Sequence, residues 1–137
     1  MTFRSVAALI IAPALIACGD DDPSGPSAAT VAGAYTLRTV NGQALPFVFI
    51  NQPTLRVEVI SDEYLLNENG TFTTTITLRE TEDTVVTMTS DSYSGQWLVS
   101  GNNVNLNSVE VGREQASFSN GNTLTFALNG VTLVYRK

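Results

Sequence analysis

The chain has 137 residues, of which 43% are hydrophobic and 15% are charged. This length suits one domain, and the hydrophobic content is too high for a disordered chain. The formal net charge is −6, from seven basic and thirteen acidic residues. The basic residues form no cluster, which argues against nucleic-acid binding because that function requires clustered positive charge to meet phosphates.

Two residue counts limit the chemistry that the chain can perform. There is no histidine, so the commonest general base and the commonest transition-metal ligand are both missing. The single cysteine allows no intramolecular disulfide and no cysteine-based zinc site. We therefore expect no cofactor and no metal site.

Residues 1–17 have the pattern of a signal peptide. Arg4 supplies a positive charge ahead of an apolar run from Val6 to Ile16. At about eleven residues, this run is too short to cross a bilayer as a helix. Leu15-Ile16-Ala17-Cys18 resembles the lipobox of bacterial lipoproteins, which implies cleavage before Cys18 and acylation of that cysteine. The alternative interpretation is an uncleaved membrane anchor or a buried N-terminal helix.

Residues 18–29 comprise Cys18, which the resemblance implies is lipidated, and a segment rich in Asp, Pro, Ser and Gly that we interpret as a tether. These residue types bury too little apolar surface to order themselves. Asp20–Asp22 are interpreted as a solvated acidic spacer, because a calcium loop needs spaced ligands and a turn glycine. The lipoprotein resemblance implies a bacterial envelope protein held to a membrane by acyl chains on Cys18. Gly19 follows Cys18, and by the sorting rule of some Gram-negative lipoproteins it favours the outer membrane.

Residues 30–137 predict an all-β domain, because apolar and polar residues alternate between turn signals. The expected strands, in chain order, lie within 31–38, 45–50, 55–59, 64–67, 72–78, 84–89, 93–99, 104–107, 116–118, 124–128 and 131–135. The segment around Pro46 is expected to be an edge strand or a packed loop. Such short strands with short connections predict an antiparallel meander that closes into a small barrel or a strongly curved sheet.

Turns are expected where Asn-Gly pairs separate the alternating runs. Asn41-Gly42, Asn69-Gly70, Asn120-Gly121 and Asn129-Gly130 are such pairs. Both central residues of a type I′ hairpin turn need positive φ, which Asn and Gly tolerate best. A further turn is expected at the charged segment 80–83.

Short motifs across the domain resemble the lipocalin-like bacterial lipoproteins. They are Gly33-Ala34-Tyr35-Thr36-Leu37, Val40-Asn41-Gly42, Leu45-Pro46, Asn69-Gly70-Thr71-Phe72, Gly95-Gln96-Trp97 and Ser100-Gly101-Asn102. Together the motifs cover nearly the whole domain. The resemblance implies a β-barrel that binds a small apolar molecule inside.

The chain departs from true lipocalins at both ends of the domain. Their first motif is Gly-x-Trp, and Gly33-x-Tyr35 stands in its place here. The arginine of their last motif has only Arg136 as a counterpart. The domain is also short, and a barrel of about eight strands has an interior that is either filled by side chains or just large enough for one ligand.

The candidate ligand-binding residues are aromatic side chains at alternating positions. They are Tyr35, Phe72, Tyr93, Trp97 and Phe126, and Phe118 and Tyr135 share the alternation. Trp97 is the best single candidate for a pocket wall, since it is the only tryptophan and Gly95 lies beside it. The alternative is that these residues form the hydrophobic core.

Four carboxylates close in sequence raise the question of a hydrolase, namely Glu58, Asp62, Glu63 and Glu68. A paired-carboxylate mechanism needs two of them in one cleft. The alternation places Glu58 on the solvent face, and the other three are expected at a turn. The Ser and Thr residues have no nearby base, and the terminal Lys137 is expected to be mobile. We therefore expect no enzymatic activity.

Two functions remain open at this point. In the first, a membrane-anchored, non-catalytic lipoprotein binds a small hydrophobic or amphipathic ligand inside a barrel. In the second, a packed β domain acts in the envelope as a structural module, binds a protein or polysaccharide, or inhibits an enzyme. The sequence does not identify a protein partner.

Overall fold

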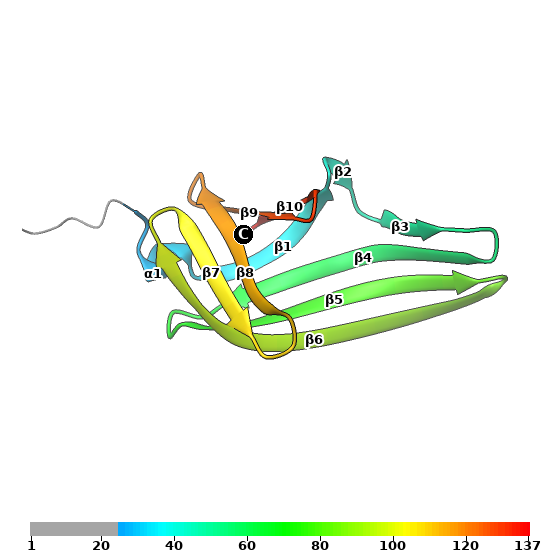
Figure 1. Cartoon of the computed structure of the whole chain (residues 1–137), viewed down its shortest axis with the longest axis horizontal. Coiled ribbons are helices and arrows are strands. Elements are labelled where there is room, and N and C mark those ends of the chain that lie inside the picture. The colour runs from blue at the N-terminus through cyan, green and yellow to red at the C-terminus, as the bar shows by residue number, and fades with distance from the viewer. Residues whose placement is uncertain (1–24) are drawn as a thin grey trace, which may run out of the picture.

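The computed structural model describes residues 25–137 (Figure 1). The predicted signal peptide, Cys18 and most of the predicted tether lie outside these residues. The elements are α1 (Ala28–Val31), β1 (Gly33–Val40), β2 (Gln43–Ala44), β3 (Phe47–Asn51), β4 (Leu55–Leu66), β5 (Thr71–Glu82), β6 (Val85–Ser100), β7 (Asn103–Ser108), β8 (Gly112–Ser119), β9 (Thr123–Leu128) and β10 (Val131–Arg136). No helix within residues 25–137 is long and apolar enough to cross a membrane.

The strands form an antiparallel barrel that β1 closes. From β4 to β10 each strand pairs with the next one in sequence. One end of β1 pairs with β4, as Gly33 does with Leu66, and the other end pairs with β10, as Val40 does with Leu133. Eight strands, β1 and β4 to β10, therefore make a closed ring, while β2 and β3 lie outside it. The predicted all-β class and barrel closure are confirmed.

Most of the Asn-Gly turns have the predicted backbone. Asn41-Gly42, Asn120-Gly121 and Asn129-Gly130 each have positive φ at both residues. Asn69-Gly70 differs, because only Gly70 has positive φ, at 84°. There the Asn69 side chain accepts hydrogen bonds from the backbone N–H and the hydroxyl of Thr71. A side-chain acceptor thus stabilises a different turn at that position.

Three strands are longer than the sequence pattern predicted. β4 and β5 have 12 residues each and β6 has 16. The expected runs 84–89 and 93–99 are one continuous strand, and the turn expected at 80–83 falls at Asp83, with φ of 52°. Ser90, Asp91 and Ser92 between those runs interrupt the apolar alternation, but all three are exposed in a strand that has solvent on both faces.

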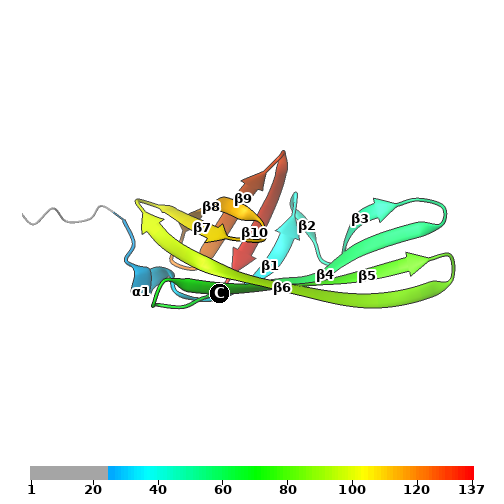
Figure 2. The same cartoon turned by 60° about the horizontal axis from the view of Figure 1, so that its bottom comes forward.

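The distal parts of these long strands leave the barrel as an arm (Figure 2). We define the arm as β3 with residues 55–61 of β4, 76–82 of β5 and 85–91 of β6. The predicted edge strand near Pro46 is β3, which pairs only with β4. The arm projects from one end of the barrel, and α1 lies near the other end (Figures 1 and 2).

The hydrophobic core fills the barrel, and a residue of α1 covers it at one end. Its buried residues are Val31, Tyr35, Leu37, Val40, Tyr64, Leu66, Phe72, Trp97, Val104, Leu106, Ala116, Phe118, Leu124, Phe126 and Tyr135. Val31 of α1 is fully buried, and the Tyr35 hydroxyl donates to its carbonyl.

Lys137 closes the α1 end of the barrel. Its Nζ donates to the carbonyl oxygens of Thr30 at 2.6 Å and Ala32 at 3.0 Å. The same ammonium lies 5.4 Å from the centre of the Tyr35 ring. The expectation that Lys137 is mobile was wrong, because the carbonyls at the end of a short helix provide acceptors for it.

Candidate functional site

Four of the five candidate ligand-binding residues lie in the core. Tyr35, Phe72, Trp97 and Phe126 are each at most 5% exposed. Tyr93 is the exception, since it is half-buried at the barrel end from which the arm projects. We call this end the mouth.

An aromatic cluster occupies the interior beneath the mouth. The Tyr64 ring centre lies 5.2 Å from that of Tyr135, 5.3 Å from that of Phe126 and 6.0 Å from that of Phe72. Phe72 also contacts Tyr93 edge-on at 6.1 Å. Edge-on and offset contacts at these distances are favourable packing geometries. The rings therefore fill the interior space that a ligand would need at this level of the barrel.

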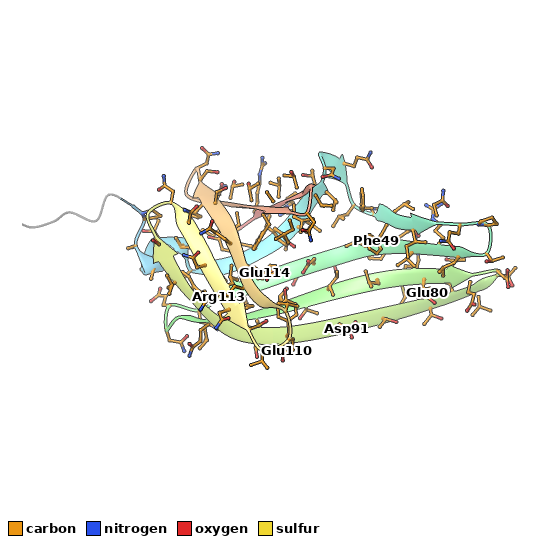
Figure 3. The ribbon with its side chains drawn as sticks, in the orientation of Figure 1. Phe49, Glu80, Asp91, Glu110, Arg113 and Glu114 are labelled. Carbon is orange, nitrogen blue, oxygen red and sulfur yellow. The ribbon has the colours of Figure 1, made fainter. Side chains whose placement is uncertain are left out.

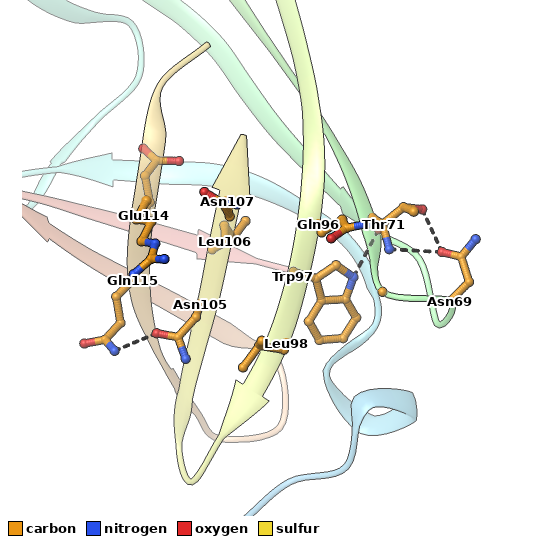
Figure 4. A pocket seen from close by; sticks show the side chains of 12 residues that line it. Asn69, Thr71, Gln96, Trp97, Leu98, Asn105, Leu106, Asn107, Glu114 and Gln115 are labelled. Atoms are coloured by element: carbon orange, nitrogen blue, oxygen red, sulfur yellow. Dashed lines mark hydrogen bonds between the residues drawn. The ribbon is translucent and has the colours of Figure 1, made fainter. Parts of the chain in front are cut away.

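Trp97 is fixed in the wall of the barrel. Its Nε1 donates to the carbonyl oxygens of Asn67 at 2.9 Å and Thr71 at 3.1 Å. Trp97 borders an open groove of about 900 Å³ (Figure 4) and a second open hollow that it shares with residues 25–28. Outward-facing side chains of β6, β7 and β8, including Leu98 and Gln115, line this groove. The hollows that Trp97 borders are therefore open to solvent and are not an enclosed cavity inside the barrel.

Asp62 lies at the mouth and is bonded to two hydroxyl groups. The Tyr135 hydroxyl donates to Oδ2 at 2.7 Å, and the Thr74 hydroxyl donates to Oδ1 at 3.2 Å. Burial raises the pKa of Asp62, and the bonds from Tyr135 and Thr74 only partly oppose this effect. The negative charge of Glu114 raises the same pKa further.

Glu114 of β8 is the second carboxylate at the mouth. The hydroxyl oxygens of Tyr64 and Tyr93 each lie 3.3 Å from its Oε2 and 2.9 Å from one another. Burial raises the pKa of Tyr93 to about 12 and also raises that of Tyr64. These tyrosines therefore stay protonated at neutral pH and can donate to a carboxylate. The mouth is a network of two half-buried carboxylates and tyrosine hydroxyls.

The four carboxylates considered from sequence are not gathered in one cleft. Asp62 and Glu63 lie inside β4 rather than at a turn, just beyond a register shift between Val59 and Ser61. Glu63 is exposed on the outer wall, and Glu68 is exposed in the β4–β5 turn. A β-bulge reorients a strand without ending it, which explains why charged residues there did not mark a turn.

Glu58 lies on the outer face of the arm, as the alternation predicted, but it is only 4% exposed. Arg56 Nη2 contacts its Oε1 at 2.9 Å, and Arg79 Nη2 contacts its Oε2 at 2.7 Å. The hydrogen bonds from the two guanidinium groups lower the pKa of Glu58. The arginines cover a carboxylate that was expected to face solvent.

Sequence reasoning missed Glu114, which is far from Asp62 in the chain. The sequence did contain a signal that Glu114 faces inward, because it is two residues before Ala116 and four before Phe118, which both face the core on the same strand. In the same way Asp62 is in phase with Tyr64, and Asp91 is in phase with Tyr93. A carboxylate at an inward-facing position of an alternating run marks the mouth.

The arm has two chemically different faces. The inner face continues the barrel interior and combines apolar and acidic side chains: Phe47, Ile50, Leu55, Val57, Val59, Ile76, Leu78, Glu80, Glu82 and Asp91. Both basic residues of β3 to β6, Arg56 and Arg79, are on the outer face with Glu58. The inner face is therefore acidic and without a basic side chain. Figure 3 shows Glu80 and Asp91 on the arm and Glu114 near the mouth.

The mouth does not form a recognisable metal centre. Across residues 25–137, no group of three or more Asp, Glu, Cys or His side chains is placed to hold a metal ion. Every buried polar side-chain atom in the same residues has a hydrogen-bond partner. A comparison with protein-family models finds no match for this chain, and a comparison with curated proteins finds none.

Proposed function

We propose that the protein is a lipid-anchored envelope lipoprotein with a lipocalin-like barrel, and that it serves as a non-catalytic protein-interaction module. The arm carries this proposal. A four-stranded extension that exposes apolar side chains has no role in filling the barrel, and exposed apolar surface is characteristic of interaction sites.

The interior of the barrel supports an interaction role over internal ligand binding. The aromatic candidates other than Tyr93 are buried against one another and against core residues. Outside the core, Phe49, Val85, Val86 and Met88 on the arm are each more than half exposed. Apolar side chains therefore face solvent on the arm, where a partner can cover them.

The arrangement of the two ends fits presentation from a membrane. Cys18 precedes the first described residue, Gly25, by a few residues, which reach roughly 20–25 Å when extended. α1 lies at the barrel end opposite the arm (Figure 1). An acylated Cys18 would hold the α1 end near the membrane, so the arm would point away from it.

Site-specific photo-crosslinking in cells tests the interaction role. A photo-reactive residue at Met88, on the arm, is expected to capture one dominant protein. The same residue at Gln115, exposed on the outer wall of the barrel, serves as the matched control and is expected to lack that product. A smear of abundant proteins from both positions would contradict the proposal.

The anchor is tested separately with Cys18→Ser. This substitution removes the thiol that accepts the first acyl chains, so the protein should leave the membrane fraction and lose its lipid mass. Continued membrane association of the variant would contradict the lipobox interpretation. Sucrose-gradient fractionation of the wild type would also distinguish the outer membrane from the inner one.

A small amphipathic ligand is the second candidate, and the mouth is the observation that favours it. Half-buried Tyr93, Asp62 and Glu114 border the apolar inner face of the arm. Such a surface suits a ligand with an apolar body and a hydroxyl or cationic group. Native mass spectrometry of the full chain should reveal a co-purified mass, and Tyr93→Phe should reduce its occupancy. A bare protein mass would exclude this candidate.

A further inference from the structure

One edge of the arm has no partner strand. Residues 85–94 of β6 pair with β5 on one side, and β7 begins to pair with β6 only at Gly95. We call residues 85–94 the β6 edge. No strand in residues 25–137 pairs with its free side, and all residues from Val85 to Ser92 are exposed. The edge therefore presents a row of unpaired backbone N–H and C=O groups.

The two edges of the arm differ in their protection. Proteins usually guard free edges with short strands, prolines, lysines or bulges. β3 is a five-residue strand with Pro46 before it, Pro53 after it, and a register shift between Val48 and Ile50. The β6 edge contains no proline, lysine or arginine, and its register with β5 is unbroken. A strand edge that lacks these protective features, on an arm whose other edge has them, is expected where that edge pairs with a strand of a partner.

The side chains along the β6 edge define the chemistry of that partner. On the outer face, Val86 and Met88 are 59% and 55% exposed. On the inner face, Thr87, Thr89 and Asp91 adjoin the acidic residues of β5, since Thr87 pairs with Glu80. A strand added here would alternate, with apolar side chains on one face and basic side chains on the other.

Two exposed valines extend the surface at the barrel end of the edge. The β7–β8 turn follows the last β6–β7 pair, Gly95 with Ser108. Its Val109 is fully exposed and its Val111 is half exposed. The Ser108 hydroxyl accepts a hydrogen bond from the Val111 N–H at 3.0 Å and holds the turn in place. An added strand would meet this apolar turn at one end.

We infer that the β6 edge binds an extended segment of a partner protein by strand addition, and that this segment alternates Lys or Arg with apolar residues. The inference rests on the proposed interaction function and specifies the partner. Main-chain hydrogen bonds supply affinity in this mode, and alternate side chains supply specificity.

A second copy of the chain is a poorer occupant than a basic segment. Antiparallel two-fold pairing of two β6 edges keeps both inner faces on the same side of the joined sheet. Asp91, Glu80 and Glu82 of the two copies would then share one surface, and each whole chain carries a net charge of −6. Like charges on one face oppose association, whereas a basic strand is attracted.

Peptide binding to the full chain in non-ionic detergent provides the first test. The labelled probes are a peptide of about ten residues alternating Lys and Val, its Glu/Val counterpart, and a Lys/Val peptide of equal composition arranged in blocks. Fluorescence anisotropy should give a Kd about tenfold lower for the alternating Lys/Val peptide than for either control. Equal binding of the block peptide, or no binding of the alternating one, would overturn the inference.

Ser90→Pro tests whether the backbone of the edge is used. The Trp97 N–H donates to Gly70 on the β5 side. Along the unbroken strand, even-numbered residues such as Ser90 therefore point their N–H to the free side. Proline removes this donor without breaking the β5 ladder. It should weaken peptide binding about tenfold, while the control Ser90→Ala, which loses the same hydroxyl contact to Thr77, should stay within about twofold.

Asp91→Lys keeps the test valid if the proline variant fails to fold. Asp91 is exposed on the inner face. Reversing its charge should weaken binding of the alternating Lys/Val peptide about tenfold and reduce the salt dependence of that binding. Unchanged affinity in every folded variant among Ser90→Pro and Asp91→Lys would overturn the inference.

The outcomes for the inference and for the proposed function are distinguishable. If the photo-reactive residue at position 88 still captures its dominant partner when Ser90→Pro is also present, the interaction function stands and strand addition is wrong. If the photo-reactive residue at position 88 of the otherwise wild-type chain captures no dominant partner, the interaction function itself fails. A concentration-dependent dimer that Ser90→Pro abolishes would identify a second copy as the occupant and overturn the basic-segment inference.

Discussion

Phe72 lies opposite Gly95 in the β5–β6 ladder, and its ring occupies the space that a side chain at position 95 would need. A Cβ built on Gly95 would lie 2.7 Å from Phe72 Cε1 and would also clash with the carbonyl oxygen of Asn107. The absence of a side chain at Gly95 leaves room for the buried ring of Phe72 beside β6.

Gly95→Ala is therefore expected to destabilise the protein by about 1–3 kcal/mol through overpacking. Chemical denaturation measures this change, and Ser94→Ala, at an exposed neighbouring position, is the matched control. In a Phe72→Leu background the cost of Gly95→Ala should fall, because one of the two clashes is relieved. Additive effects of the two substitutions would show that the ring does not set the requirement for glycine.

Trp97→Phe is expected to cost about 1–3 kcal/mol, because it leaves the carbonyl oxygens of Asn67 and Thr71 without the indole donor and removes part of a buried ring. The free energy of unfolding, measured in urea, provides the test. Leu98→Ala removes an exposed side chain beside it on the same strand and should change stability by less than about 0.5 kcal/mol. Equal effects of the two substitutions would contradict the structural role of the indole N–H.

The wild-type protein is expected to lose stability as the pH rises and Asp62 ionises, and Asp62→Asn should remove this loss. The pKa of Asp62 is higher in the folded state than its ordinary value of 3.8, so the folded state binds the proton more tightly than the unfolded state does. Its contribution is complete below about pH 4 and is lost as the pH rises through the raised folded pKa. Unfolding midpoints measured across this range should decline less in the variant than in the wild type.

Glu63→Gln is the matched control for this measurement. Glu63 is the next residue on β4 but is exposed on the opposite face. In this variant the decline assigned to Asp62 should persist, because the hydrogen bonds from Tyr135 and Thr74 to Asp62 are untouched. A wild-type profile in Asp62→Asn as well would mean that Asp62 does not carry the predicted linkage.

Glu58→Gln is expected to loosen the arm and leave the barrel unchanged. The substitution weakens both arginine contacts and leaves Arg56 and Arg79 close together without a countercharge. Hydrogen exchange should accelerate in β3 and in the distal part of β4, but not in β9 or β10. Uniform acceleration throughout the chain would contradict a local role.

The same contacts predict an acid-sensitive arm. The pKa of Glu58 is lower in the folded state than its ordinary value of 4.5. The stabilisation that it provides is therefore present above that value and is lost as the pH falls through the lowered folded pKa. This direction is opposite to that of Asp62, so exchange in the arm at acidic pH separates the two carboxylates.

The sequence by itself determined the local structure of this protein. Alternation of apolar and polar residues identified most strands and the inward-facing aromatic residues, because side chains on a strand have a period of two. Asn-Gly pairs located hairpins such as that at Asn129-Gly130, since few residues tolerate positive φ. Both signals are carried by neighbouring residues and need no knowledge of distant contacts.

Only the tertiary structure decided which distant residues meet and where the barrel ends. The pairing of β1 with both β4 and β10, the approach of Glu114 to Asp62, and the contact of Lys137 with α1 join residues far apart in the chain. The arm could not be predicted from the sequence either. Along β6 both faces of the strand are exposed to solvent, so apolar and polar residues do not alternate regularly there. A pattern of burial can be read only where the fold buries one face of a strand, and β6 extends beyond that region.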